Sequence, residues 1–197
     1  SGEINILVGT QLISKGFHFP NLNCIIVLDI DLTSHGHDLR SAEKNLQLYH
    51  QLSGRAGRTG KPANVYFQTY NLKPDIIDQI TNEDPFKFLD KELELRKKNN
   101  LPPYERFISL ILSSSNEKIL NVEATKLKNI ISKSINEKIL GPVDAPIYRI
   151  NQKFRSRLLI RSKKSSKTQK KLKFLLNEFN LPKGIKLTVD VDPISFN

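Results

Sequence analysis

The order of apolar segments between residues 106 and 192 constrains the fold more than any other feature of the sequence. Short apolar or alternating runs predict four strands, at residues 106–114, 146–150, 154–161 and 185–192. Helical spacing predicts two helices, over residues 116–135 and 166–179, the first capped by Asn116. This βαββαβ order predicts a four-stranded antiparallel sheet with two helices on one face.

The first part of the chain has a different pattern. Nearly continuous apolar runs predict strands at residues 4–8, 24–30 and 64–69. An amphipathic segment around residues 40–56 predicts a helix between the last two strands. Alternating strands and helices of this kind are typical of an α/β fold with a parallel sheet covered on both faces. Residues 1–72 are therefore predicted to form the end of such a domain, whose earlier strands lie outside this sequence.

A helical linker is predicted between the two parts, over residues 73–103. Pro74 and Pro85 stand at or near the first turns of two helices, with Asp84 as an N-cap. The segment Leu101-Pro102-Pro103 cannot continue the second helix. The expected domains are residues 1–72, 73–103 and 104–197.

The net charge of +11 is concentrated in the second half of the chain. Residues 1–100 contain 12 basic and 12 acidic side chains, whereas residues 101–197 contain 19 basic and 8 acidic ones. This asymmetry favours a polyanionic partner for the second half. No apolar run is long enough for a membrane span, and no signal peptide is expected because the first residues lack a basic leader. The absence of methionine predicts a fragment or processed product. The single cysteine, Cys24, excludes an internal disulfide framework and is expected to be a buried thiol in a reducing cytoplasm.

The segment QLSGRAGR, residues 51–58, contains a candidate phosphate-binding group. If the helix continues through it, Arg55 and Arg58 lie on one helical face, and the adjacent glycines allow a ligand to approach. Arginine stays charged and binds phosphate in a bidentate manner, and Gln51 lies one turn earlier. The alternative is an ordinary helix C-terminus, with glycines that end the helix and arginines that complement its dipole.

A second candidate segment, VGTQLISKG at residues 8–16, follows the first predicted strand. The carboxyl end of a strand in an α/β sheet is a usual place for a ligand. Its polar and glycine residues are Gly9, Thr10, Gln11, Lys15 and Gly16. An ordinary strand-to-helix loop is the alternative interpretation.

Together, the two segments resemble two signatures of the second motor lobe of superfamily 2 helicases, which is RecA-like. The chain resembles the PriA family of primosomal replication-restart helicases in four sequence segments, GTQLISKGFHFPN, LDIDL, DLRSAE and QLSGRAGR. The resemblance implies that Gly9 to Gly16, through Thr10, Gln11 and Lys15, couple nucleotide to DNA. It also implies that Arg58 is an arginine finger, with Arg55 and Gln51 positioning the nucleotide.

The resemblance further implies a 3′–5′ ATP-dependent DNA helicase of the bacterial cytoplasm that restarts stalled replication forks. Its cofactors would be ATP and Mg²⁺, and its partners forked and single-stranded DNA, single-stranded-DNA-binding protein and primosome proteins, with no membrane. The C-terminal domain of the family resembles ribosomal protein S-ten. The rivals are another superfamily 2 translocase and a non-catalytic module that binds DNA or an acidic protein.

Several features of this chemistry are absent from the sequence. There is no G-x-x-x-x-G-K-[ST] loop and no DEAH-type box, so the chain alone is expected not to hydrolyse ATP. The cysteine-rich zinc module of the PriA family does not lie in these residues. His35-Gly36-His37-Asp38 lacks a cysteine nearby and is expected to be an exposed loop rather than a metal site. Asp29 and Asp31 are expected to be strand-end acids, so no metal ligand is predicted.

A basic run extends from Tyr148 to Lys173 without an acidic residue. Its cations are Arg149, Lys153, Arg155, Arg157, Arg161, Lys163, Lys164, Lys167, Lys170, Lys171 and Lys173. The first seven, Arg149 to Lys164, are the candidate DNA-binding residues, since Arg155 and Arg157 share one sheet face and can follow a phosphate backbone. Tyr148 and Phe154 are candidates for stacking on unpaired bases. The alternatives are a solvated basic face or a docking surface for an acidic protein tail.

Overall fold

The computed structural model describes residues 4–10, 19, 22–30, 39–54, 64–70 and 85–194. The chain divides into two compact units, Ser1–Leu89 and Asp90–Asn197. The division falls inside helix α4 (Pro85–Lys98), whereas the sequence pattern placed the boundary at residue 103.

The first unit contains a parallel pair of strands and one helix. Strands β1 (Cys24–Val27) and β2 (Asn64–Phe67) pair in parallel, with Cys24 opposite Asn64 and Val27 opposite Phe67. Helix α2 (Ser41–Ser53) follows β1 in the chain and packs on the pair, since the rings of Tyr49 and Phe67 meet edge-on at 5.2 Å. The order strand, helix, strand and the parallel pairing confirm the α/β prediction for this unit.

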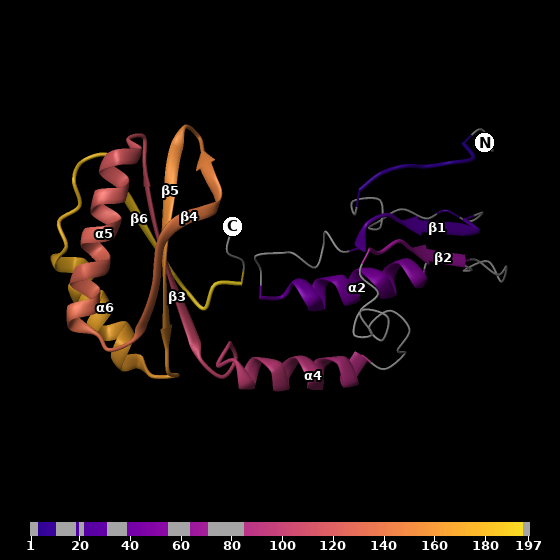
Figure 1. Cartoon of the computed structure of the whole chain (residues 1–197), viewed down its shortest axis with the longest axis horizontal. Helices are drawn as coiled ribbons and strands as arrows, with labels where there is room; N and C mark the ends of the chain where they lie inside the picture. The colour runs from indigo at the N-terminus through magenta and orange to yellow at the C-terminus, as the bar shows by residue number, and fades with distance from the viewer. Residues whose placement is uncertain are drawn as a thin grey trace. The chain divides into compact units, whose positions relative to one another are not determined.

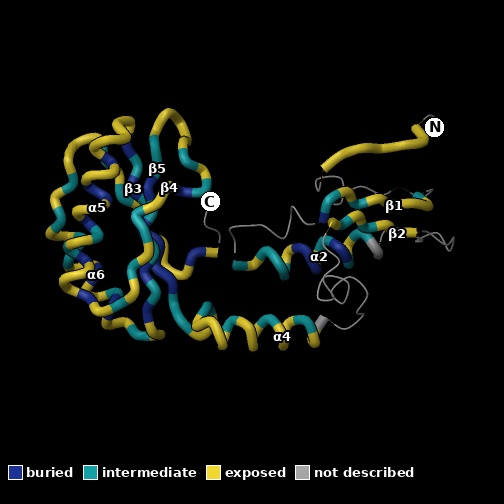
Figure 2. Tube along the Cα trace, viewed as in Figure 1, coloured by how far each residue is buried: buried dark blue, intermediate teal, exposed yellow. Residues whose placement is uncertain are grey.

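Only one face of this strand pair is covered within the described residues (Figure 2). Ile26, Leu28 and Tyr66 point away from α2 and are 64%, 70% and 56% exposed. Cys24 lies on the same uncovered side of the strand pair and is exposed, so the prediction of a buried thiol was wrong. Its apolar neighbours indicated burial, but burial depends on a covering layer that these residues do not supply.

Residues 4–8 form no strand, contrary to the prediction from their apolar composition. Ile4, Ile6 and Val8 are 75%, 82% and 85% exposed. An apolar run gives only a tendency, because a strand forms when its backbone groups pair with a neighbouring strand.

The second unit is built on a four-stranded antiparallel sheet (Figure 1). Its strands are β3 (Arg106–Ser114), β4 (Lys138–Ile150), β5 (Lys153–Ser162) and β6 (Lys186–Val191). They lie in the order β4-β5-β3-β6, and each neighbouring pair is antiparallel. The predicted βαββαβ topology is confirmed, and the main difference is that β4 begins eight residues before the expected Pro146.

Helices α5 (Glu117–Ser134) and α6 (Ser166–Glu178) cover one face of this sheet, as predicted (Figure 1). Alternate residues of the central strands face the helices and are fully buried, namely Ile108, Leu110, Leu112, Leu158 and Ile160. They pack with Leu120, Leu127 and Ile131 of α5 and with Leu172 of α6. Asn116 caps α5, since its Oδ1 accepts a hydrogen bond from the Ile119 N–H at 3.1 Å.

Strands β4 and β5 form a hairpin with a bulged edge strand. Asn151 and Gln152 join them as a two-residue turn, with φ angles of 49° and 62°. Two-residue hairpin turns whose twist matches that of the strands require positive φ at both residues. The pairing shifts register between Leu140 and Val143. Gly141 lies in this bulge with φ +94°, and a Cβ there would come within 2.5 Å of the Arg157 carbonyl oxygen. Glycine therefore allows β4 to bend close to β5.

Candidate nucleotide and nucleic-acid interface

Eight residues of the segments 9–16 and 51–58 are predicted to bind nucleotide or couple it to DNA, and the structure describes three of them. Gly9 and Thr10 lie in an exposed, irregular segment, and Gln51 lies exposed near the C-terminal end of α2. Helix α2 ends at Ser53, where the Gly54 N–H binds the His50 carbonyl oxygen. The other five, Gln11, Lys15, Gly16, Arg55 and Arg58, lie outside the described residues.

The candidate metal segment, His35-Gly36-His37-Asp38, also lies outside the described residues, as does Asp31. Asp29 follows β1 with a φ of 52°. Within the residues that are described, no three His, Cys, Asp or Glu side chains gather closely enough to hold a metal ion.

The sheet of the second unit has one face that α5 and α6 do not cover. Because Leu158 and Ile160 point to the helices, the odd-numbered residues of β5 point to the opposite face. These are Lys153, Arg155, Arg157, Leu159 and Arg161. We call this the open sheet face, and it collects four of the seven predicted DNA-binding residues.

Arg155 and Arg157 are the central cations of the open sheet face. Arg155 is oriented by its own hairpin, since its Nη1 donates to the Ile147 carbonyl oxygen at 3.2 Å. Partial burial lowers the pKa of the Arg157 guanidinium, and repulsion from Arg155 lowers that pKa further. The two guanidiniums therefore repel each other, and an external anion between them would relieve this repulsion.

Strand β6 adds a cation that the sequence analysis did not select. Ser113 of β3 pairs with Arg155 on one side and with Lys186 on the other, so the three lie in one row across the sheet. Lys186 is exposed and on the same face as Arg155. The alternation of residues 185–192 was the available signal, but only the strand order, with β3 between β5 and β6, brings Lys186 into the same row as Arg155.

Arg161 binds the chain itself. Its Nη2 donates to the carbonyl oxygens of Asn99 and Asn100, each at 3.0 Å, and its Nε pairs with Glu105 at 3.3 Å. The carbonyls belong to the two residues that follow α4, where Asn100 has a φ of 53° and the Leu101 N–H binds the Arg96 carbonyl oxygen. Arg161 thus attaches the end of α4 to the sheet, a structural role that the basic run did not reveal.

The two predicted stacking aromatics face away from the open sheet face. Phe154 packs against the helix-side core, and its ring lies 5.4 Å from that of Tyr148. Arg149 lies over the Phe154 ring at 5.0 Å, so it too is on the helix side. The Tyr148 hydroxyl donates to Glu117, and this hydrogen bond raises the pKa of Tyr148 to about 12. Phe154 and Tyr148 therefore cannot stack on a base held by Arg155 and Arg157.

Lys163 and Lys164 lie between β5 and α6, and both are exposed. In the parts of the chain that are described, no helix combines the length and the apolarity needed to cross a membrane.

Comparison with known protein families gives two matches that divide the chain much as the structure does. Residues 1–60 match the helicase conserved C-terminal domain. Residues 97–194 match the primosomal protein N C-terminal domain.

Curated relatives match almost the whole chain. A protein of Rickettsia felis named replication restart protein PriA is 43% identical over 195 residues, which are 98% of this chain and 30% of that protein. Proteins of the same name from Bacillus subtilis and Thermotoga maritima are 35% and 33% identical, each over 98% of this chain. The chain covers 24% and 25% of those two proteins, so it spans less than a third of the length of each of the three.

Proposed function

Because the chain belongs to the PriA family of replication restart proteins, we propose that it acts as the C-terminal part of a 3′–5′ ATP-dependent DNA helicase. In this proposal the first unit completes the nucleotide site of the motor and the second unit contacts forked and single-stranded DNA. The observation that supports it most directly is the pair of matches, a helicase domain followed by the primosomal domain, in the order of the two units.

The nucleotide role falls to residues of both motor segments. Arg58 would stabilise charge on the phosphates in the transition state, with Arg55 and Gln51 positioning the nucleotide. Thr10, Gln11 and Lys15, flanked by Gly9 and Gly16, would sense bound nucleotide and touch a DNA phosphate. These groups are hydrogen-bond donors and cations, which suits them to phosphate oxygens. They supply no carboxylate for Mg²⁺, so ATP and Mg²⁺ would be held chiefly by residues elsewhere in the full-length protein.

Zinc does not fit this chain. A structural zinc site needs four ligands of the Cys and His type, and the sequence has one cysteine, which is exposed on a strand. The zinc of the family would therefore be bound by other residues of the full-length protein.

The DNA role falls mainly to the open sheet face. Lys153, Arg155 and Arg157 of β5, together with Lys186 of β6, would contact phosphates. Lys163 and Lys164 stay in the proposed set, because they are exposed beside β5. Arg149 and Arg161 are assigned structural contacts instead. Single-stranded-DNA-binding protein and primosome proteins are the proposed protein partners, and the bacterial cytoplasm is the proposed location.

The nucleotide assignment is tested in a full-length PriA that contains this chain. Arg58→Ala should lower DNA-stimulated ATP hydrolysis by about 10³-fold or more, as for other arginine fingers, while DNA affinity is retained. Arg40→Ala is the control, because Arg40 pairs with Glu43 at the opposite end of α2. ATP hydrolysis within a few-fold of wild type in Arg58→Ala would refute the assignment.

The DNA assignment is tested by salt dependence. Replacing both Arg155 and Arg157 by Gln should reduce the slope of log affinity against log salt for a forked DNA by nearly two, since each lost phosphate contact removes about 0.9. The double variant of Lys97 and Lys98 to Gln removes the same charge from α4 and should change the slope less. Equal changes in both variants would indicate a general charge effect and contradict a site on the open sheet face.

A further inference from the structure

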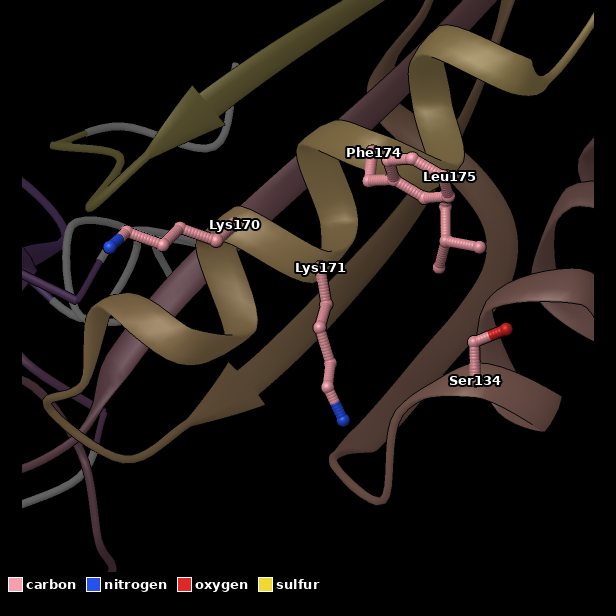
Figure 3. Close-up of a pocket in the computed structure, with 5 residues that line it drawn as sticks. All are labelled: Ser134, Lys170, Lys171, Phe174 and Leu175. Carbon is pink, nitrogen blue, oxygen red and sulfur yellow. The ribbon is translucent and has the colours of Figure 1, made fainter.

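A hollow lies on the helical side of the second unit, away from the open sheet face. It has a volume of about 400 Å³ and is bordered by Lys170, Lys171, Phe174 and Leu175 of α6 and by Ser134 at the end of α5. Lys171 and Leu175 extend toward the end of α5, whereas Lys170 extends to the other side of α6 (Figure 3). No role has been given to this region by the sequence motifs.

The charges on α6 are arranged unfavourably for an isolated helix. Lys167, Lys170, Lys171 and Lys173 occupy its first two turns, and its first acidic residue is Glu178. Like charges three and four residues apart destabilise a helix, and cations in the first turn oppose its dipole. Among the residues that are described, no carboxylate pairs with these four ammonium groups. The carboxylate near the start of α6, Glu137, instead accepts a hydrogen bond from Thr168 at 2.8 Å.

Phe174 directly follows these four lysines on α6. Lys170 and Lys171 precede it by four and three residues, so they flank Phe174 on the surface of α6, with Lys171 on the side of α5 and Lys170 on the other side (Figure 3). The Phe174 side chain is 63% exposed, although a phenylalanine is usually buried. Within the described residues its ring contacts no other aromatic ring, in contrast to the paired rings of Tyr148 and Phe154.

We propose that this face of α6 binds single-stranded nucleic acid, with one base stacked on Phe174 in the hollow and the adjacent phosphates bound by Lys170 and Lys171. An exposed ring among cations is the combination that holds unpaired bases without sequence preference. A duplex keeps its bases stacked and cannot offer one to the ring. This inference rests on the proposed DNA-helicase function and adds a second surface, on the opposite side of the sheet from Arg155 and Arg157.

An acidic peptide with an aromatic anchor is the competing occupant. Peptides are commonly bound along a sheet edge, where their backbone groups find partners, or along an extended apolar groove. The hollow lies between two helix surfaces rather than at a sheet edge, and its apolar part consists of Phe174 and Leu175 with charged residues around them. Unpaired bases, whose backbone supplies the negative charge, match this surface better.

The test measures binding of the 197-residue chain to a fluorescent oligothymidine and to a duplex of equal length. Phe174→Ala should weaken oligothymidine binding about tenfold with an unchanged salt slope, because a stacking contact is lost and no phosphate contact is. Lys171→Gln should lower the slope by about 0.7, the value for one phosphate contact of a single strand. Duplex affinity should be unchanged in Phe174→Ala.

Two exposed residues of α5 provide matched controls. Val122→Ala removes an apolar side chain with the same 63% exposure as Phe174, and Lys118→Gln removes one helical lysine. Both should bind oligothymidine within twofold of wild type. An oligothymidine with 5-iododeoxyuridine should in addition cross-link to the α6 peptide that contains Phe174.

Three outcomes would overturn the inference. The first is that Phe174→Ala binds oligothymidine like wild type, while replacement of both Arg155 and Arg157 by Gln abolishes binding. Single strands then do not bind at α6, and the proposed function stands. If Phe174→Ala releases an Asp-rich peptide ending in phenylalanine but not oligothymidine, the surface binds acidic protein. If the wild-type chain binds no oligonucleotide, this inference and the DNA role of the second unit both fail, while ATP hydrolysis in Arg58→Ala still tests the motor assignment.

Discussion

Arg161 provides the sharpest test of the fold, because its three contacts join the residues directly after α4 and directly before β3 to strand β5. Arg161→Ala removes two hydrogen bonds to the carbonyl oxygens of Asn99 and Asn100 and an ion pair with Glu105. The two hydrogen bonds are exposed and contribute about 0.5–1 kcal/mol each. The partly buried ion pair adds a similar amount. We expect a loss of about 2 kcal/mol in the free energy of unfolding of the second unit.

The loss should appear as a fall in the melting temperature of the second unit of about 10 °C, given the usual sensitivity of a domain of this size. Hydrogen exchange read peptide by peptide separates this unit from the first and should show weaker protection at residues 95–101. Arg161→Lys should recover only part of the loss, because one ammonium group cannot reach both carbonyls and the carboxylate. Glu105→Gln should lose less than Arg161→Ala, since the carbonyl contacts remain.

The same variants decide between a structural and a DNA-binding role for Arg161. If Arg161 binds the chain itself, Arg161→Ala changes stability and leaves the salt slope of DNA binding unchanged. An unchanged melting temperature together with a slope reduced by about one would refute the reasoning and return Arg161 to the DNA-binding set.

Two further predictions concern the pKa of Tyr148 and the glycine in the bulge of β4. The hydrogen bond to Glu117 raises the pKa of Tyr148 to about 12, so an ultraviolet titration should show a late ionisation that Glu117→Gln returns toward pH 10. Because the folded pKa is the higher one, this contact stabilises the fold fully below pH 10 and is lost between pH 10 and 12. Gly141→Ala should destabilise the second unit by about 1–3 kcal/mol in urea unfolding, since its Cβ would clash with the Arg157 carbonyl oxygen. Gly184→Ala, at φ +90° with nothing within 4 Å, should lose less, and an equal loss would contradict the clash.

The second unit was predictable from sequence because its strands, helix caps and turns are each indicated by residues close together in the chain. The predicted strand at residues 106–114 coincides with β3, and Asn116 caps α5 as expected. Strand β5 shows the alternation of a sheet with one helix-covered face, and the hairpin turn at Asn151-Gln152 fixes the pairing of Ile150 with Lys153 and of Arg149 with Phe154. The fold of this unit could therefore be derived from periodicity and turn chemistry.

The first unit was less predictable because strand formation and burial depend on neighbouring segments and not on composition alone. Among the residues that the structure describes, no strand pairs with residues 4–8 despite their strand-like composition, and no layer covers Cys24 despite its apolar neighbours. Composition indicates which residues prefer burial, whereas burial itself depends on what packs against them.

Individual roles within the basic run required three-dimensional contacts. The sequence places Arg155, Arg157 and Arg161 at odd-numbered positions of one strand, and all three do share one face. It cannot show that the carbonyls of Asn99 and Asn100 come within reach of Arg161 from 61 residues or more away in the chain. Conversely, Lys186 lies far from β5 in sequence and joins its surface only through the strand order β5-β3-β6.

The topology also divides one continuous charge run between two opposite surfaces. The period of two along β5 sends Arg155 and Arg157 to the open sheet face, while the chain then turns and places the lysines of α6 on the helical side. Because the two sets of cations lie on opposite sides of the sheet, no single phosphate can bridge them. A DNA strand bound by both sets would have to pass around an edge of the sheet, at β4 or β6. A forked DNA, which offers two strands at once, could instead place one strand on each surface. We therefore expect loss of both surfaces to weaken fork binding more than loss of either, whereas a short single strand should respond mainly to the α6 variants.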